Sequence, residues 1–149
     1  MLKELGFTDA RSNLTAVIDD VQKWIPAMIK ARKRSESGTI LMNNDMVKEL
    51  LLGSYKFEIE ATHEETGEVS LWDNVTDFGA FGDTFEEALH ELALVLSGYA
   101  EGYYEQSTIF LNDPNTRKQF PYILRVLMCE SNDELKDILR KNICQDFET

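Results

Sequence analysis

Carboxylates are the side chains of this sequence most able to do chemistry, because converging acids can hold divalent metal ions beside a phosphate. The acids that could take this role lie in the middle of the chain and are Asp73, Asp77, Asp83, Glu86 and Glu87. They gather in an expected loop and at an expected helix start, where acids favour the helix dipole and accept backbone hydrogen bonds. We therefore expect a structural role for them and no metal-dependent nuclease.

Other catalytic groups are sparse. His63-Glu64-Glu65 and His90-Glu91 lack the second histidine of a zinc-protease motif, and there is no glycine-rich phosphate loop or Gly-x-Ser-x-Gly turn. Cys129 and Cys144 have no zinc-binding spacing and are too few for a disulfide framework. We expect ordinary packing or surface cysteines in a reducing cytoplasm, and a protein that is not an enzyme and takes no cofactor or metal.

Charge is divided unevenly along the chain, whose formal net charge is −12. Residues 1–56 hold nine Lys/Arg and seven Asp/Glu, a balance of +2, whereas residues 57–149 hold six and twenty, a balance of −14. Proteins bind nucleic acid through basic groups that displace counterions, so only the first part, with its basic run at 30–34, suits DNA. The acidic part suits a basic protein partner.

Length and composition predict a globular protein. The 149 residues, 43% of them hydrophobic, are enough for one or two small domains. The longest uncharged stretches, such as residues 92–100, fall short of the roughly 20 apolar residues of a membrane span, and no signal-peptide core follows Met1. We expect a soluble cytoplasmic protein with no membrane partner.

The N-terminal patterns predict a helix, a hairpin and a second helix. Apolar residues at helical spacing predict one helix, capped by Thr8 and ended by Pro26. Residues 27–31 and 39–42 alternate as strands of a hairpin, and a helix that ends at Gly53 follows. A unit of about fifty residues buries too little surface to be stable alone, so we expect it to dimerise.

The later patterns predict a small sheet followed by helices. Strands are expected at residues 55–61, from Val69 and at 78–81, and helices after Thr84 (to about Gln106), from Pro114 (to about Cys129, with a break at Pro121) and after Ser131. Thr84 and Ser131 each precede a glutamate by three residues, the spacing in which hydroxyl and carboxylate satisfy backbone donors. The predicted fold class is α+β, with domains at residues 1–53 and 54–149.

A short motif near the N-terminus carries a family resemblance. The string Ala10-Arg11-Ser12-Asn13-Leu14, followed by a basic hairpin and a second helix, resembles the A-R-x-N-L helix and hairpin of the Phd/YefM antitoxin family over residues 7–52. This resemblance implies a homodimer that places its N-terminal helices on operator DNA. It carries over as DNA-binding residues Arg11, Ser12 and Asn13 and, in the hairpin, Lys30, Arg32, Lys33 and Arg34.

Each of these groups also has a simpler interpretation. The motif could be an ordinary solvated first turn, and a basic hairpin can be a solvated edge that discourages strand pairing. The turn at 34–38 is also longer than the short Arg-Gly turn usual in that family, and it includes Glu36.

The second half resembles a different antitoxin family. After a strand hairpin, the string from Gly82 to Ala88 is similar to the G-D-T-x-E-E-A of the HicB family, whose domain is a shortened RNase H-like sheet. The resemblance covers residues 55–106 and implies a small α/β domain; the same string is also a generic helix start. The sequence departs from the pattern after Tyr104, where helices replace an expected strand.

Together the resemblances imply a type II antitoxin. It would bind and neutralise a basic ribonuclease toxin of RelE-like or related type, and repress its own operon as a DNA-binding homodimer. The alternative is a protein-interaction module that dimerises without binding DNA. Apolar residues on the helices of the acidic domain are candidate toxin contacts, namely Tyr122, Leu124 and Leu127. These residues could instead close the domain core, with the toxin at the sheet edge.

Overall fold

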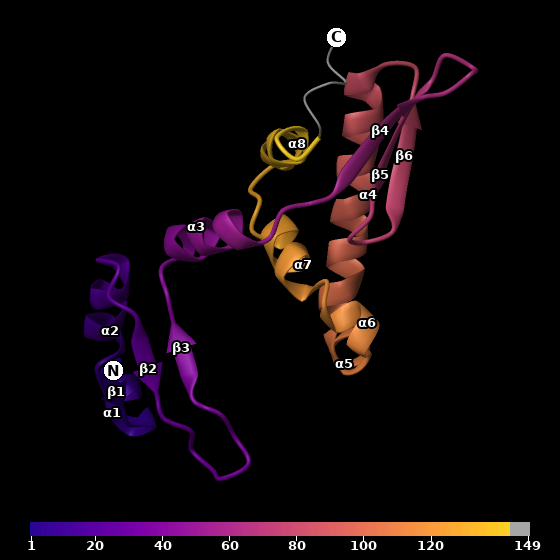
Figure 1. The fold of residues 1–149 in the computed structure, drawn as a ribbon. Coiled ribbons are helices and arrows are strands. Elements are labelled where there is room, and N and C mark those ends of the chain that lie inside the picture. The colour runs from indigo at the N-terminus through magenta and orange to yellow at the C-terminus, as the bar shows by residue number, and fades with distance from the viewer. Residues whose placement is uncertain (144–149) are drawn as a thin grey trace. The chain divides into compact units, whose positions relative to one another are not determined.

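A computed structural model describes residues 1–143 of the chain, so Cys144 lies outside the described residues (Figure 1). Over this range the chain has eight helices and two three-stranded sheets, which confirms the predicted mixture of α and β structure. It divides into two compact units, residues 1–50 and the chain from Leu51 onward. None of the helices in residues 1–143 is long and apolar enough to cross a membrane.

The N-terminal unit packs two short helices beside a small sheet. Its helices are α1 (Phe7–Ser12) and α2 (Leu14–Gln22), and its strands are β1 (Glu4–Leu5), β2 (Ala27–Ile29) and β3 (Thr39–Leu41). Strand β2 is central, because it pairs parallel with β1 and antiparallel with β3. The core is small: Val17, Val21 and Ala27 are buried, with Leu5 and Leu41 packed against them.

The predicted single helix is wrong in two places. The chain leaves helical geometry at Asn13, whose Nδ2 donates a hydrogen bond to the carbonyl oxygen of Asp9 at 3.1 Å, a local bond that competes with the helix. Thr8 is not the cap, since α1 begins at Phe7 after Gly6. Helix α2 ends at Gln22, and Trp24 just beyond it has left-handed backbone, with φ at 66°.

The hairpin and the second helix follow the predicted order. Strands β2 and β3 pair Met28 with Ile40, and residues 30–38 form a connection longer than the predicted turn. Helix α3 (Asn44–Ser54) begins where the Oδ1 of Asn43 accepts a hydrogen bond from the N–H of Asp45 at 2.8 Å. Strand β1 was not predicted, because two residues are too few to show an alternation.

The C-terminal unit is built on an antiparallel meander of β4 (Ile59–His63), β5 (Val69–Asp73) and β6 (Phe78–Gly82), in that spatial order. The register aligns Ala61, Leu71 and Ala80 across the three strands, and these side chains share the face that turns toward the core. Strands β4 and β6 are the two edges of this sheet, and the first residue of β4, Ile59, also makes an isolated parallel bridge to Ile143.

The first strand of this sheet starts later than predicted, because tertiary contacts hold residues 55–58 out of the ladder. Nη1 of Arg125 donates to the carbonyl oxygen of Tyr55 at 2.6 Å. The N–H of Glu58 donates to Oδ1 of Asp73 at 3.3 Å. The alternation of apolar and polar residues correctly indicates which side chains are buried, as at Phe57. The backbone of residues 55–58, however, is not a strand.

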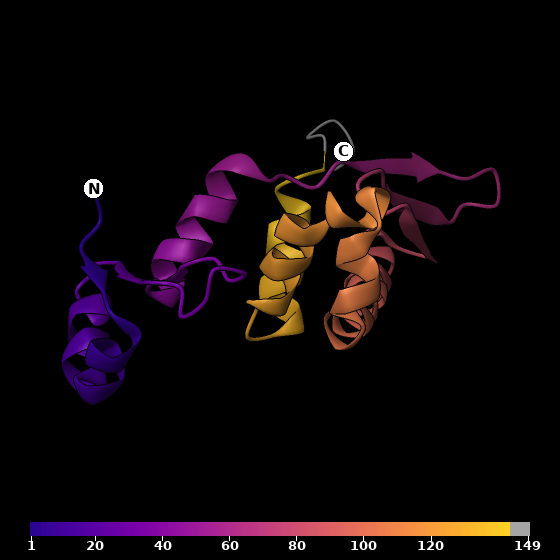
Figure 2. The same cartoon turned by 90° about the horizontal axis from the view of Figure 1, so that it is seen from below.

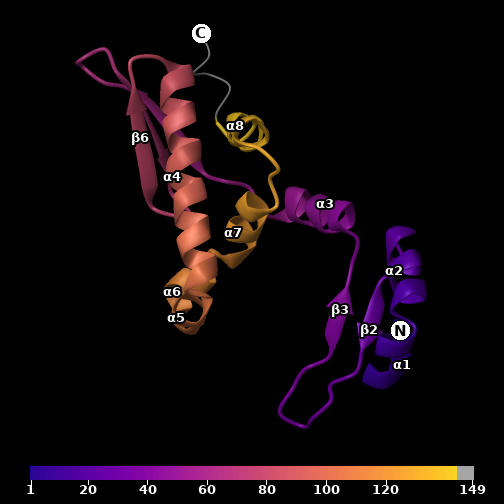
Figure 3. The same ribbon diagram turned by 180° about the vertical axis from the view of Figure 1, so that it is seen from behind.

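Helices make up the rest of the unit: α4 (Phe85–Glu105), α5 (Ser107–Asn112), α6 (Pro114–Arg117), α7 (Phe120–Leu127) and α8 (Asn132–Arg140). Helix α4 lies between the sheet on one side and α7 and α8 on the other (Figures 2 and 3). The largest fully buried apolar side chains come from all these layers and are Tyr103, Leu71, Leu89, Leu92, Leu96, Ile123, Leu135 and Leu139.

Both predicted capping sites are confirmed. The Oγ1 of Thr84 accepts a hydrogen bond from the N–H of Glu87 at 3.2 Å, and the Glu87 carboxylate accepts from the N–H of Asp83 at 3.0 Å. Ser131 and Glu134 repeat this arrangement at the start of α8, with distances of 3.1 and 2.8 Å.

The helix predicted from Pro114 to Cys129 is two helices, α6 and α7. The interruption falls at Lys118 and Gln119 rather than at Pro121, which lies in the first turn of α7, where a missing N–H costs no hydrogen bond. Helix α5 was not predicted.

Asp73 organises the sheet from a buried position, because its carboxylate accepts hydrogen bonds from three backbone N–H groups and one hydroxyl. These donors are Glu58 N, Val75 N, Thr76 N and Thr76 Oγ1. We expect Asp73→Ala to lower the free energy of unfolding by about 2–4 kcal/mol, since buried donors lose their acceptor. Urea unfolding followed by circular dichroism measures this change.

The matched control is Asp77→Asn in the same turn. Asp77 is exposed and has left-handed backbone with φ at 65°, which asparagine tolerates, so the change should stay within about 0.5 kcal/mol. Equal effects of the two substitutions would show that the buried carboxylate does not organise the turn.

Candidate functional site

The residues predicted to contact DNA lie in two places of the N-terminal unit. Arg11 and Ser12 are exposed at the end of α1, and Arg11 makes no ion pair with any described residue. Asn13 is exposed too, but its amide already donates to the carbonyl oxygen of Asp9. Arg11 is therefore a free cation, while Asn13 also holds the junction of α1 and α2.

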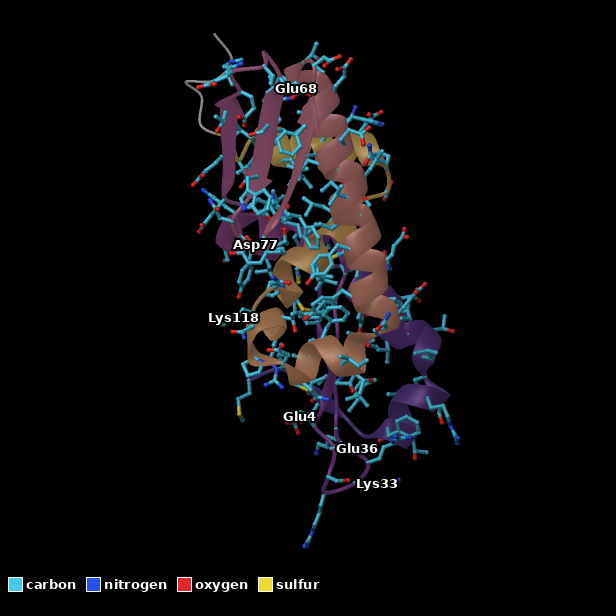
Figure 4. The ribbon with its side chains drawn as sticks, turned by 90° about the vertical axis from the view of Figure 1, so that its right-hand side faces the viewer. Glu4, Lys33, Glu36, Glu68, Asp77 and Lys118 are labelled. Carbon is cyan, nitrogen blue, oxygen red and sulfur yellow. The ribbon has the colours of Figure 1, made fainter. Side chains whose placement is uncertain are left out.

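The remaining four candidates lie at the start of the β2–β3 connection, and two of them have acidic partners. Lys30 lies 3.5 Å from the carboxylate of Glu4, an exposed pair. Arg32 donates from Nη2 and Nε to the two carboxylate oxygens of Glu36, at 2.8 and 3.1 Å. Its guanidinium also lies over the ring of Phe7, 5.3 Å from the centroid. Figure 4 labels Glu4, Lys33 and Glu36 in this region.

The Arg32–Glu36 pair shapes the connection rather than presenting a free charge. Hydrogen bonding to Arg32 lowers the pKa of the Glu36 carboxyl, so this acid stays ionised beside its partner. The pair borders a cavity of about 530 Å³ that Phe7, Ile29 and Thr39 also line. Lys33 and Arg34 are exposed and form no ion pair within the described chain, so the connection presents two unpaired cations, not four.

The N-terminal unit also exposes many large apolar side chains. Those at least two-fifths exposed include Leu2, Phe7, Leu14, Ile18, Trp24, Ile25, Ile40 and Leu50. The core cluster of this unit, by comparison, has three buried residues, Val17, Val21 and Ala27. The exposed side chains are candidates for a binding interface.

In the C-terminal unit, the acids considered as metal ligands have structural roles. Asp73 is buried in its hydrogen-bond network, and Asp77 lies in the β5–β6 turn. Glu87 belongs to the cap of α4, and Glu86 forms an ion pair with Arg140 that lowers the pKa of the Glu86 carboxyl. No group of acids, histidines or cysteines in residues 1–143 is arranged to hold a metal ion.

The predicted toxin contacts lie on α7 and are partly buried. The ring of Tyr122 packs edge-on against Tyr55 and Phe57, and burial raises the pKa of its hydroxyl. Leu127 packs against the main core as well, while Leu124 is half-buried. Tyr122 and Leu127 thus help to close the core, the role that the sequence analysis held as the alternative.

Arg125 on the same helix is a buried cation with no carboxylate partner in the described chain. Its side chain is 6% exposed, it donates to the Tyr55 carbonyl oxygen, and it lies 5.8 Å over the ring of Phe57. Burial lowers the pKa of its guanidinium. Arg125 therefore holds the segment that leads into β4, and it does not form part of an exposed basic surface.

The face of the sheet that points away from α4 was not predicted from the sequence. Its outward side chains are Glu60, Thr62, Ser70, Trp72, Gly79 and Phe81, which we call the open sheet face. Trp72 is 42% exposed and Phe81 60% exposed. The signal was present as large aromatic residues at the polar positions of two alternating strands, Val69–Asp73 and Phe78–Gly82.

The charged residues of the sheet and of α4 themselves are all acidic. Residues 57–116, which include the whole sheet and all of α4, contain fourteen Asp/Glu and no Lys or Arg. All six basic residues after position 57 follow residue 116. The turns at the two ends of the sheet carry Glu68 and Asp77, both labelled in Figure 4.

A family model and a solved structure both relate this chain to antitoxins. The model of the PHD-like family, described as the antitoxin of a RelE/RelB toxin–antitoxin system, matches residues 1–141. A crystal structure of the antitoxin part of a proposed toxin/antitoxin system from Syntrophomonas wolfei subsp. wolfei is similar, with a TM-score of 0.81 and 27% identity over 96% of this chain and 97% of that one. No curated protein matches the chain. Because the family match runs through both units, this chain belongs to the PHD-like family of RelE/RelB-system antitoxins.

Proposed function

We propose that this antitoxin binds and neutralises a basic ribonuclease toxin of RelE type, and that it represses its own operon as a DNA-binding homodimer. In this proposal the N-terminal unit has the Phd/YefM arrangement of helix, hairpin and helix and reads operator DNA. The C-terminal unit, similar to HicB over its sheet and α4, binds the toxin.

The observation that carries the proposal is the separation of charge between the two units. A toxin that cleaves RNA needs a basic surface to hold its substrate, and an inhibitor that covers this surface benefits from acid. The folded segment of residues 57–116 carries fourteen acids and no Lys or Arg. DNA would be repelled by such a surface, so the DNA-binding role falls to the N-terminal unit.

Operator binding rests on Arg11 and Ser12, with Lys33 and Arg34 as further phosphate contacts. All four are exposed, and neither Arg11, Lys33 nor Arg34 forms an ion pair within the described residues. The exposed apolar side chains of the N-terminal unit, Ile18 and Ile40 among them, supply the interface of the homodimer. A two-fold dimer would present two copies of Arg11 to a palindromic operator.

A second candidate function is a protein-interaction module that dimerises without binding DNA. The specific observation in its favour is that Glu4 and Glu36 pair with Lys30 and Arg32, which offsets the charge of two of the four cations predicted to contact DNA from the hairpin. The operator-binding experiment below separates the two candidates.

Neutralisation is tested with the protein encoded by the reading frame next to this gene. We expect the full-length antitoxin to abolish RNA cleavage by that protein at equimolar concentration. We expect its affinity to fall as ionic strength rises, because salt screens charges beyond about 10 Å at 0.1 M. RNA cleavage that persists in excess antitoxin would refute the proposed function.

Operator binding is tested with Arg11→Ala and DNA from upstream of the gene, in gel shifts at several salt concentrations. Loss of one phosphate contact should reduce the salt slope by about one, and loss of a base contact should cost roughly 1–3 kcal/mol and relax sequence preference. The control is Lys23→Ala, which removes another exposed basic side chain of the N-terminal unit. Sedimentation at micromolar concentration should show that both variants remain dimers.

If Arg11→Ala and Lys23→Ala bind operator DNA equally well, the DNA contact lies elsewhere. If the unsubstituted protein shows no specific shift, the second candidate function holds.

A further inference from the structure

The open sheet face is a surface that its own unit leaves uncovered. Helix α4 packs on the opposite face of the sheet, and α7 and α8 lie beyond α4 (Figure 2). In the register, Trp72 lies between Glu60 and Gly79, and Ser70 lies between Thr62 and Phe81. Two aromatic side chains therefore stand among small and polar neighbours on an exposed sheet.

Gly79 allows the indole of Trp72 to lie against the sheet. A Cβ at position 79 would clash with the Trp72 ring and would stand 2.8 Å from the carbonyl oxygen of Leu71. The absence of a side chain there thus provides room for the ring on the backbone of β6. A large aromatic ring that is supported from below and still 42% exposed is suited to be a preorganised binding anchor.

Acids surround the two aromatic residues. Glu60 belongs to the open sheet face itself, and its carboxylate is held by Nδ2 of Asn74 at 2.9 Å. Glu58 precedes β4, and Glu68 and Asp77 lie in the turns at the two ends of the sheet, all of them exposed. An aromatic centre within a polar, charged rim is the usual composition of a protein-binding surface.

The negative charge of this surface determines which class of molecule could bind to it. Nucleic acid is excluded by repulsion, since residues 57–116 have no Lys or Arg to meet phosphate. A second copy of the same face would bring acid against acid, and like charges across an interface are costly. A basic protein is the remaining occupant that gains from both the aromatic anchors and the acidic rim.

We propose that the open sheet face, with Trp72 and Phe81 as anchors and Glu60 in the rim, is the surface on which this antitoxin binds its basic RNA-cleaving toxin. The proposal rests on the function proposed above and locates the toxin on the sheet instead of on α7. Tyr122 and Leu127 of α7 are committed to core packing, whereas Trp72 and Phe81 are free to contact a partner.

The first test uses the protein encoded by the reading frame next to this gene, called the neighbouring-frame protein. Calorimetry measures its binding to the full-length Phe81→Ala and Trp72→Ala variants of the antitoxin. Loss of a central aromatic anchor should weaken binding at least about 30-fold for either variant. The matched control is Tyr104→Ala, which removes another exposed aromatic side chain, 70% exposed on α4, and should leave binding unchanged within about twofold. Circular dichroism melting shows whether each variant is folded.

A second test leaves both aromatic residues, Trp72 and Phe81, unsubstituted. The chain has two tryptophans, so Trp24→Phe leaves Trp72 as the sole source of tryptophan fluorescence. Burial of Trp72 under the bound protein should shift its emission to the blue and reduce quenching by acrylamide. This readout depends on the position of the partner, and it stays informative if Trp72→Ala fails to fold.

The outcomes separate this inference from the proposed function. If the unsubstituted antitoxin inhibits RNA cleavage, but Phe81→Ala binds as well as Tyr104→Ala and Trp72 emission does not change, the toxin binds elsewhere and the inference is wrong. Leu124→Ala would then be the variant expected to lose binding. If the unsubstituted antitoxin neither binds nor inhibits the neighbouring-frame protein, the proposed function and the inference fail together.

Discussion

A single helix lies against the sheet of the C-terminal unit, and a three-stranded sheet has two faces to cover. Helix α4 buries Leu71 and Ala80 on one face, while α7 and α8 pack on the far side of α4 and join the same core. The second face, with Trp72 and Phe81, must therefore meet either water or another molecule. Because one helix covers only one of the two faces of the sheet, the folded unit also carries an exposed aromatic surface.

Electrostatics then decides what each surface can meet. Several acids on the sheet and α4 serve local structure, as Asp73 and Glu87 do. Because residues 57–116 include fourteen acids and no Lys or Arg, they also give this part of the unit a strong negative charge. In the N-terminal unit the numbers of acids and bases are nearly balanced, and Glu36 holds Arg32 within the β2–β3 connection. The same residue types thus produce a strongly acidic segment in one half and, in the other, a nearly neutral unit with a few cations that are unpaired among residues 1–143.

Much of this fold follows from local sequence signals, and the exceptions have physical causes. The caps at Thr84 and Ser131 were predictable because three-residue spacing to a glutamate is a purely local pattern. The break at Asn13 was not predicted, because a side-chain hydrogen bond there competes with the helix. The break predicted at Pro121 was misplaced, because a proline is tolerated in the first turn of a helix. Residues 55–58 read as a strand, yet the buried groups of Arg125 and Asp73 hold them out of the sheet.

Among the candidate site residues, too, some could be predicted from the sequence and others could not. The family motif located Arg11, which is exposed and unpaired among the described residues, but it did not reveal that Glu36 occupies Arg32. Tyr122, Leu124 and Leu127 were chosen as apolar residues among charges, a pattern that does not distinguish a core-closing helix from a binding helix. The open sheet face needed the register, since Trp72 becomes notable only when it is known to lie over Gly79 on the side away from α4.

The central claim is that one unit binds DNA and the other binds the toxin, and amide hydrogen exchange on the full-length antitoxin tests it most directly. The account predicts that operator DNA slows exchange at residues 7–13 and 30–38. It predicts that the neighbouring-frame protein slows exchange in β5 and β6, residues 69–82, and leaves residues 1–50 unchanged. Protection by that protein confined to residues 1–50, or the same segment protected by both ligands, would contradict the division.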